Sequence, residues 1–337
     1  MNAENKTAAI KWYRCPVRRE DLRALNQRSD FKGMLQTVGH LGALALTGTC
    51  AYISIGRLDW PLVVLIFFLH GTCFAYLTNG FHELVHDSVF KTRFLNRFFL
   101  WIFSFLGSYN HIAFWASHTE HHKYTLHPPD DLEVVLPMKV SLKGFLASGF
   151  VNVKGAYQVL KMNLRLGCGR LEGEWEHALF PESDPAKRRK LFNWARILLV
   201  GHGSLTVIFL LCGLWPLPVL ITLAPFYGGW LQQLCNHTQH IGLQDNVPDF
   251  RVCCRTVILN PFVRFLYWHM NYHIEHHMYA AVPCYNLGRL HKLIRDDLPQ
   301  CPHGLIRAWR EITTILKRQR VEPNYQYAPE LPSSATP

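Results

Sequence analysis

Charged residues are scarce in this sequence of 337 residues: they make up 18% of it, whereas 49% of the residues are hydrophobic. Soluble globular proteins usually contain about 25% charged residues. The shortage argues against an ordinary soluble domain and favours a membrane protein. The charges that are present are unbalanced, with a formal net charge of +11. Basic residues gather outside the apolar stretches, which suits an anionic membrane surface.

Several motifs that indicate other classes of protein are missing from the sequence. The ten cysteines include no C-x-x-C pair, and only Cys253 and Cys254 are adjacent, so neither a disulfide framework nor a zinc ribbon is expected. This cysteine usage favours a reducing compartment for the active face. The basic residues follow no RNA-binding or zinc-finger pattern, which argues against nucleic acid as a partner. Residues 167–169, GCG, lack the third glycine of a dinucleotide fingerprint, so no flavin or nicotinamide site is expected.

Four apolar stretches each have about the ~20 residues that cross a bilayer as a helix. They cover about 36–56, 60–80, 194–215 and 216–235. Short turns at 57–59 and 213–218 join them into two hairpins, and long basic segments lie at their other ends. The positive-inside rule therefore places the N-terminus, residues 82–193 and the C-terminus in the cytosol. Buried core helices of a soluble all-α protein are the alternative, which the recurrence of four such lengths disfavours.

The remaining segments complete the expected domain organisation. Residues 1–35 form a cytosolic segment without the apolar core of a secretory signal, so we expect it to stay uncleaved. Residues 36–300 form the main domain, in which 94–109 and 141–166 have the composition of interfacial helices. Residues 301–337 form a C-terminal segment. Its tail from residue 322 has four prolines and is expected to be disordered.

Histidine is the residue in clear excess, with 19 copies, and nine of them lie at helical spacings in four clusters near the ends of the apolar stretches, with His237 as a tenth histidine inside one cluster. The clusters have the sequences HELVH at 82–86, HTEHH at 118–122, NHTQH at 236–240 and HIEHH at 273–277. Residues three or four positions apart share one face of a helix. A lone histidine is usually a structural or surface residue, but nine at these spacings on one side of a membrane predict a metal site.

The number of histidines indicates two metal ions. One ion accepts about four to six ligands, so nine imidazoles leave positions on two ions for water, oxygen or substrate. Imidazole suits iron, copper and zinc alike. Iron is preferred, because a site that faces a membrane interior has apolar C–H bonds to act on, and breaking them requires oxygen activated by a redox metal. Zinc has no redox chemistry.

The order H-x-x-x-H, H-x-x-H-H and H-x-x-H-H resembles that of the membrane fatty acid desaturase and hydroxylase superfamily over about residues 36–300. The resemblance implies that two irons are bound by His82, His86, His118, His121, His122, His240, His273, His276 and His277. It also implies that Asn236 holds a metal-bound water. The clusters of the pattern H-x-x-x-H or H-x-x-H-H are called histidine boxes in that superfamily. Residues 278–291 are similar to the segment after the last histidine box in acyl desaturases, while NHTQHIG at 236–242 is similar to a motif of alkane monooxygenases as much as to that of desaturases.

The resemblance implies a fold and an activity. The fold would be an all-α integral membrane protein, with four transmembrane helices in two hairpins and a cytosolic helical cap that carries the histidine boxes. The activity would be that of an oxygen-dependent di-iron desaturase, which introduces a double bond into a fatty acyl or similar lipid-like chain. A hydroxylase of the same superfamily is the alternative. A bacterial inner membrane and the endoplasmic reticulum both fit this expectation.

The two electrons that the reaction needs would come from outside the chain. No H-P-G-G motif of a fused cytochrome b5 domain is present, so a separate ferredoxin or cytochrome b5 is expected to dock on the basic cytosolic face. From a different class, HELVH at 82–86 also matches the H-E-x-x-H motif of zinc proteases, with Glu83 as general base. That interpretation leaves seven of the nine histidines unexplained. A histidine-rich metal transporter is disfavoured because the histidines lie outside the spans.

Other polar residues near the clusters are candidates for orienting the ligand rings. The carboxylates among them are Glu83, Asp87, Glu120, Asp130, Asp131 and Glu275. Four histidines could do the same or could simply pack as surface or aromatic neighbours: His111, His127, His237 and His269. A further three, His40, His70 and His202, fall inside the expected spans. There they either serve a function or are satisfied by a neighbouring helix.

Overall fold

The computed structural model describes residues 9–138 and 140–332, and in these ranges the chain is helical, with isolated β-bridges but no β-strand. The first half contains α1 Arg19–Leu25, α2 Asp30–Ser54, α3 Trp60–Ala75, α4 Leu77–Val85, α5 Arg93–Leu106, α6 His111–Tyr124, α7 Leu142–Gly149 and α8 Val153–Gly167. The second half contains α9 Gly173–Leu179, α10 Pro185–Leu211, α11 Pro216–Leu220, η2 Ala224–Phe226, α12 Trp230–Asn236, α13 Phe250–Cys253, α14 Pro261–Leu266, α15 His273–Met278, α16 Cys284–Ile294, η3 Arg295–Asp297 and α17 Leu305–Gln319.

The first predicted hairpin is formed by α2 and α3, which contact each other along their length. The side chain of Ser29 caps the start of α2 by accepting a hydrogen bond from the Lys32 N–H, and Pro61 lies in the first turn of α3, where its missing N–H is tolerated. After α3 the chain continues through Tyr76 into α4, so that Trp60–Val85 forms one long apolar element. This element delivers the first histidine cluster directly from the end of a membrane-length helix.

The second predicted hairpin differs from the expectation. Its first member is α10, which is long and apolar enough to cross a membrane. Its second member, predicted as a span over 216–235, is not one helix but consists of α11, η2 and α12 with irregular chain between them. This return segment, residues 216–236, contains three prolines: Pro216, Pro218 and Pro225. Proline has no backbone N–H to donate, so these residues prevent a continuous helix. Among the described residues, two helices rather than four therefore have both the length and the apolarity of a span: Trp60–Val85 and Pro185–Leu211.

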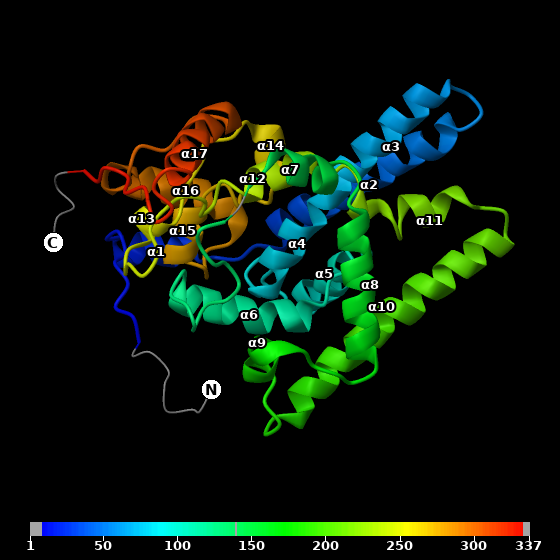
Figure 1. Cartoon of the computed structure of the whole chain (residues 1–337), viewed down its shortest axis with the longest axis horizontal. Coiled ribbons are helices and arrows are strands. Elements are labelled where there is room, and N and C mark those ends of the chain that lie inside the picture. Colours follow the sequence, from blue (N-terminus) through cyan, green and yellow to red (C-terminus); the bar gives the residue numbers. More distant parts are fainter. Residues whose placement is uncertain (1–8, 139, 333–337) are drawn as a thin grey trace.

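The return segment instead packs closely against the first hairpin. Gly228 has a φ of +70°, and a Cβ at this position would lie 2.5 Å from the carbonyl oxygen of Phe68 and 2.6 Å from the amide nitrogen of Thr72. Only glycine allows the two backbones to approach in this way. Figure 1 shows both hairpins projecting from the same side of a body of shorter helices.

The three histidines expected inside spans all have partners on neighbouring elements. His40 accepts a hydrogen bond from the Trp268 indole and lies 3.1 Å from the Cys73 carbonyl. His70 bonds to Thr47 and to the Leu220 carbonyl of the return segment, and His202 bonds to the Phe105 carbonyl and to Thr222. These rings thus join elements within the apolar region, as expected for structural histidines.

The two segments expected to lie at the interface form α5 and the pair α7 and α8. Large apolar side chains of α5 and α8 are exposed: Phe94, Phe98, Trp101, Val153, Tyr157, Leu160 and Leu164. Exposed apolar rows on short helices that also carry lysine and arginine are suited to the boundary between headgroups and acyl chains. In Figure 1, α5 and α8 lie next to the ends of the hairpins that join the rest of the molecule.

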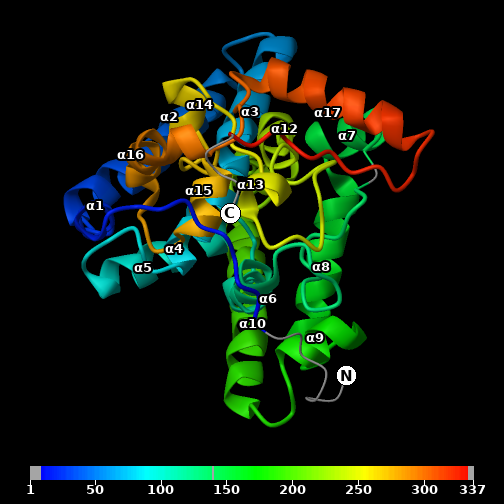
Figure 2. The same ribbon diagram turned by 90° about the vertical axis from the view of Figure 1, so that its left-hand side faces the viewer.

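The helical body on the other side of the hairpins has its own core. Figure 2 shows α15 near the middle of this body, and α13 and α16 contact it. The N-terminal segment belongs to the body, because the Arg251 guanidinium lies 3.7 Å from the centre of the Tyr13 ring and the Tyr13 hydroxyl donates to Asp297 at 2.7 Å. Part of the tail expected to be disordered also contacts the body, since the Tyr327 N–H donates to the Gly242 carbonyl at 2.8 Å. Residues 333–337 of that tail lie outside the described part of the chain.

Candidate metal centre

Helices α4, α6 and α15 carry three of the four histidine clusters. The first cluster lies at the end of α4, which continues the long apolar element from α3. The second lies on α6, whose start is capped by the Asn110 side chain, and the amide of Asn110 in turn donates to the Leu191 carbonyl of α10. The third cluster begins at the end of α12, and the fourth lies on α15, in which every residue is buried. Both hairpins and the body therefore contribute to one centre.

The rings gather into two groups. In the first group one ligand atom from each of five residues lies within 4.8 Å of all the others, and its members are His82, His86, His118, His122 and His276. The second group meets the same limit and consists of His240, Cys254, His273 and His277. The His121 ring lies beside the second group, 5.3 Å from His240 and 4.9 Å from His277 between ring centres. All nine histidines predicted from the sequence therefore lie in one centre.

Each of the two H-x-x-H-H boxes contributes histidine rings to both groups. On α6, the outer pair His118 and His122 belongs to the first group, and His121 faces the second. On α15, the outer pair His273 and His277 belongs to the second group, and His276 joins the first. The second and third histidines of each cluster are adjacent in the chain, so they point about 100° apart around the helix and can face different groups. Each box can thus supply ligands to two different ions.

The Nε2 atoms of the rings point toward one another within each group. The Nε2 of His122 lies 2.9 Å from that of His118 and 3.2 Å from that of His276. In the second group the Nε2 of His273 lies 2.9 Å from that of His240 and 3.1 Å from that of His277. Several nitrogen lone pairs directed at one point are suited to a cation.

The opposite nitrogen, Nδ1, is held by an acceptor in several rings, which fixes the tautomer. The Nδ1 atoms of His118, His121 and His240 lie 2.8 to 2.9 Å from Glu133, Asp131 and the Cys253 carbonyl. Since these acceptors require a proton on Nδ1, Nε2 keeps its lone pair. This is the usual support for metal-binding imidazoles.

Burial keeps most of these rings neutral, which is the form that binds metal. Burial lowers the pKa of a set of five rings well below the usual histidine value: His118, His122, His273, His276 and His277. Burial also lowers the pKa of His240, to about 3. His121 is the exception: burial is the largest single influence and lowers its pKa, but the hydrogen bond to Asp131 and the negative charges of Asp131 and Glu133 together outweigh it and raise the pKa. In addition, the buried Nε2 of His86 has no hydrogen-bond partner, as expected of an atom reserved for a ligand.

A comparison with known protein families places the chain in one of them. The model of the fatty acid desaturase family matches residues 58–309, a range that includes every histidine of both groups. The chain belongs to the fatty acid desaturase family. Membership implies an oxidoreductase. The chain is also similar to a sphingolipid delta(4)-desaturase of Schizosaccharomyces pombe, with 26% identity over 279 residues that cover 77% of this chain and 70% of the yeast protein.

The carboxylates of this desaturase differ in their roles. Asp131 is fully buried and holds His121, and the carboxylate of Glu83 lies 3.4 Å from the Nδ1 of His82 and 3.5 Å from that of His276. The expectation that Glu120 and Glu275 also orient ligands is wrong. Glu120 pairs with Lys123 at the surface, whereas Glu275 accepts hydrogen bonds from Thr256 and His291. The direction in which a carboxylate leaves a short helix depends on tertiary packing, which spacing does not reveal.

Two residues of the desaturase centre have no counterpart among the sequence-based candidates. Glu133 holds His118, and its position two residues after Asp131 in the segment that follows the second box is the only local signal for it. Cys254 lies in the second group, where its neighbour Cys253 supplies the carbonyl that holds His240. Both lie in irregular chain that follows a histidine cluster, where no helical spacing links them to it.

Asn236 lies at the end of α12, and the helix does not continue to His240 as the spacing argument assumed. The Asn236 side-chain oxygen accepts a hydrogen bond from Asn79 at 3.3 Å. The other four histidines near the boxes, His111, His127, His237 and His269, belong to neither group. His111, for example, packs edge-on against Trp194, and His237 packs against Trp309 with 6.4 Å between ring centres.

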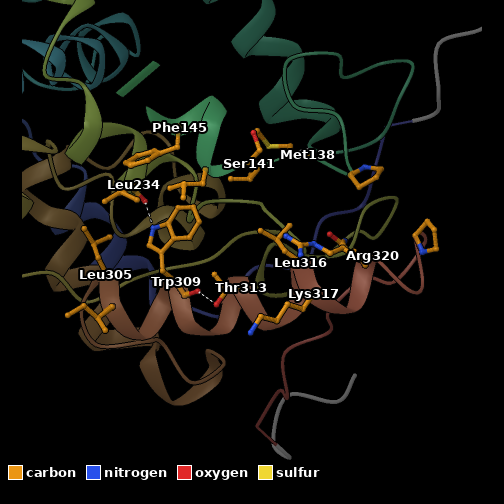
Figure 3. Close-up of a pocket in the computed structure, with 16 residues that line it drawn as sticks. Met138, Ser141, Phe145, Leu234, Leu305, Trp309, Thr313, Leu316, Lys317 and Arg320 are labelled. Carbon is orange, nitrogen blue, oxygen red and sulfur yellow. Dashed lines mark hydrogen bonds between the residues drawn. The ribbon is translucent and has the colours of Figure 1, made fainter. Parts of the chain in front are cut away.

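An apolar cavity of about 770 Å³ lies between α7, α12 and α17 of the desaturase. Figure 3 shows Phe145, Leu234, Leu305 and Trp309 around it, and the Trp309 indole donates a hydrogen bond to the Leu234 carbonyl at 3.0 Å. Leu234 is two residues before Asn236, so this wall of the cavity is continuous with the helix that leads to the metal centre. The volume lies within the usual range for a ligand pocket, about 300 to 1,000 Å³.

Proposed function

We propose that the protein is an oxygen-dependent di-iron desaturase that acts on the acyl or other long alkyl chain of a lipid. The observation that carries the proposal is the convergence of nine histidine rings in one centre, where the Nε2 atoms of six of them point toward one another within the two groups. Family membership and similarity to a yeast enzyme named for a sphingolipid support the reaction and the lipid class. In the reaction, a –CH2–CH2– unit loses two hydrogen atoms, and one O2 takes them up with two electrons and two protons to form two waters.

Iron is the metal that fits this donor set and this reaction. The first ion would be held by the five histidines of the first group, and the second by His121, His240, His273 and His277. Bound iron would supply the redox chemistry that unactivated C–H bonds require. The chain itself orients the ligand rings through Glu83, Asp131 and Glu133, and it surrounds them with buried side chains that exclude water. We further propose that Asn236 positions a water molecule near the second ion.

The placement of Glu83 disfavours the zinc-protease alternative. The general base of such an enzyme must reach a water on the open side of the metal. Here the carboxylate of Glu83 is buried against the Nδ1 atoms of two rings, His82 and His276, on the side away from the converging Nε2 atoms. Glu83 is thus placed to hold ligands rather than to activate water.

The decisive experiment is analysis of lipids by mass spectrometry from cells that express the chain. A desaturase should yield products that lack two hydrogen atoms, whereas a hydroxylase would yield products that gain one oxygen atom. Cells that express a His122→Ala variant serve as the control, because that ring contacts two others of the first group. Electrons would come from a separate ferredoxin or cytochrome b5. Unchanged lipids in the presence of either donor would contradict the proposal.

The metal content is the second expected result. Protein purified without chelators should carry close to two irons per chain, because nine rings are too many for one ion. Elemental analysis of the purified protein checks this. One zinc per chain, with activity that survives removal of iron, would exclude the di-iron assignment.

The topology gives a third prediction. We propose that the return segment crosses the membrane with α10, so that the loops at Leu58 and Trp215 lie opposite the histidine boxes. Their side chains are 45% and 49% exposed. Single cysteines at these positions should react with an impermeant maleimide added to the non-cytosolic side, and a cysteine at Lys123 should react from the cytosolic side. The exposed native cysteines Cys50, Cys168 and Cys212 are first replaced with serine. Labelling of all three introduced positions from one side would contradict this topology.

The cavity beside α17 gives a fourth prediction, since we propose that it receives part of the lipid chain. Phe145→Arg would place a charge in the apolar lining, and we expect kcat/KM to fall by roughly 10-fold or more, in line with the cost of burying an unpaired charge. Phe262→Arg is the matched control, because Phe262 is 66% exposed and does not line the cavity. Equal effects of the two variants on kcat/KM would show that the cavity has no part in substrate binding.

A further inference from the structure

The second histidine group contains a sulfur atom that the desaturase motifs do not include. The Sγ atom of Cys254 lies within 4.8 Å of a ring nitrogen from each of His240, His273 and His277, and all four side chains are buried. Metal–nitrogen and metal–sulfur bonds of about 2.0 to 2.3 Å allow donors of one ion to lie up to roughly 4.4 Å apart. The limit of 4.8 Å exceeds this value, so the side chains would move closer together when all four atoms bind one ion.

The backbone around Cys254 fixes its position relative to these rings. Cys254 follows the last residue of α13, and its N–H donates to the Phe250 carbonyl at 3.0 Å. The preceding carbonyl, that of Cys253, accepts the Nδ1–H of His240 at 2.9 Å. The same dipeptide thus orients one ligand ring with its backbone and presents a thiol to the group with its side chain.

The number of donors in the two groups gives a reason for a further ligand. The first group has five imidazoles within the distance limit, whereas the second has three, with His121 beside it. Cys254 would bring the second group to five protein donors, equal to the first. Asn236 offers no such direct donor, because its side-chain oxygen bonds to Asn79.

We propose that Cys254 is a sulfur ligand of the ion in the second group. The inference rests on the proposed di-iron function and makes its two ions chemically different, one bound by nitrogen alone and the other by nitrogen and sulfur. On binding, the Cys254 thiol loses its proton to solvent and the S–metal bond replaces the S–H bond. A thiolate is a soft ligand that iron, cobalt and zinc all accept. The alternative role is that of a small buried side chain, which is common for cysteine.

The adjacent cysteine provides a matched control. Cys253 is equally buried, and its Sγ lies 3.9 Å from that of Cys254, but it is not a member of the group. Purified full-length protein is stripped of metal and reloaded with Co²⁺, which gives an intense near-ultraviolet absorption when a thiolate binds it. We expect this band in the native protein and in Cys253→Ser, and its loss in Cys254→Ser with about two Co²⁺ per chain still bound.

Two further results separate the possible failures. X-ray absorption at the iron edge of the native protein should show sulfur at about 2.3 Å, and this measurement does not depend on whether a variant folds. If the native protein binds two irons but shows neither this sulfur nor the cobalt band, Cys254 is not a ligand and the di-iron proposal stands. A band that persists in Cys254→Ser would overturn the inference in the same way. A native protein that binds no pair of irons would instead overturn the proposed function itself.

Discussion

Replacing His240 with alanine should remove about one iron per chain and lower turnover by more than the roughly 10- to 100-fold typical of residues outside the ligand shell. His240 connects the second group to the body, because its Nε2 lies 2.9 Å from that of His273 while its Nδ1 donates to the Cys253 carbonyl. The ring is buried and neutral, so the variant loses both a ligand and the contact that holds the 253–254 dipeptide. Iron content and turnover of the purified variant are the measurements.

The control for this experiment is three residues away. His237 is also partly buried, but its ring faces Trp309 and belongs to neither group. His237→Ala should therefore keep close to two irons per chain. If His237→Ala lost an iron and His240→Ala kept both, the ligand assignment in this segment would have to be exchanged.

Replacing Asp131 with asparagine should weaken the centre without removing any ligand. Its carboxylate accepts hydrogen bonds from His121 and from the backbone N–H groups of Leu126 and Glu133, all at 2.8 to 2.9 Å. An amide is uncharged and would lose at least one of these bonds. We expect a fall of roughly 10- to 100-fold in iron affinity or turnover, the usual scale for a residue that orients a ligand. Iron titration of the metal-free protein measures the affinity.

Glu120→Gln is the matched control for Asp131→Asn. Glu120 lies within the second box, but its carboxylate pairs with the exposed amine of Lys123 at 2.9 Å. Exposed ion pairs contribute about 0 to 1 kcal/mol, so this variant should retain its iron affinity. A greater loss from Glu120→Gln than from Asp131→Asn would contradict the assignment of Asp131 to the support of His121.

Eight of the nine histidines lie on or at the end of α4, α6 and α15, where helical spacing is a local property that the sequence reveals. His240 lies beyond the end of α12, so helical spacing does not account for its place in the centre. Spacing could not predict which rings form each group. That depends on how α6 and α15 pack in the fold, where His121 lies beside the second group and His276 joins the first. The same limit applies to Glu133 and Cys254, because each lies in irregular chain after a histidine cluster and reaches the centre only through the path of that chain.

The helices of the first hairpin were predictable, because Ser29 and Pro61 provide local signals for where α2 and α3 begin, although of the two only α3, continued by α4, has both the length and the apolarity of a span. The return segment was not, because its mean composition is as apolar as that of a span. Three prolines and the close approach at Gly228 outweigh that composition. The helix from Asn236 to His240 that the spacing assumed is also not formed. The chain turns after Asn236, and the Nδ1–H of His240 donates to the Cys253 carbonyl.

The ligands come from residues as far apart in the chain as His82 and His277. During synthesis, no complete centre could form until the last histidine cluster has left the ribosome, by which time, in the proposed topology, both hairpins would have entered the membrane. If iron binds as proposed, it would act as a late link between the N-terminal, middle and C-terminal thirds of the chain, because metal binding contributes directly to folding free energy. In a cell that is short of iron, the newly made chain would lack this link and would remain exposed to quality-control proteases. Iron supply would thus govern how much of the protein accumulates as well as how fast it works.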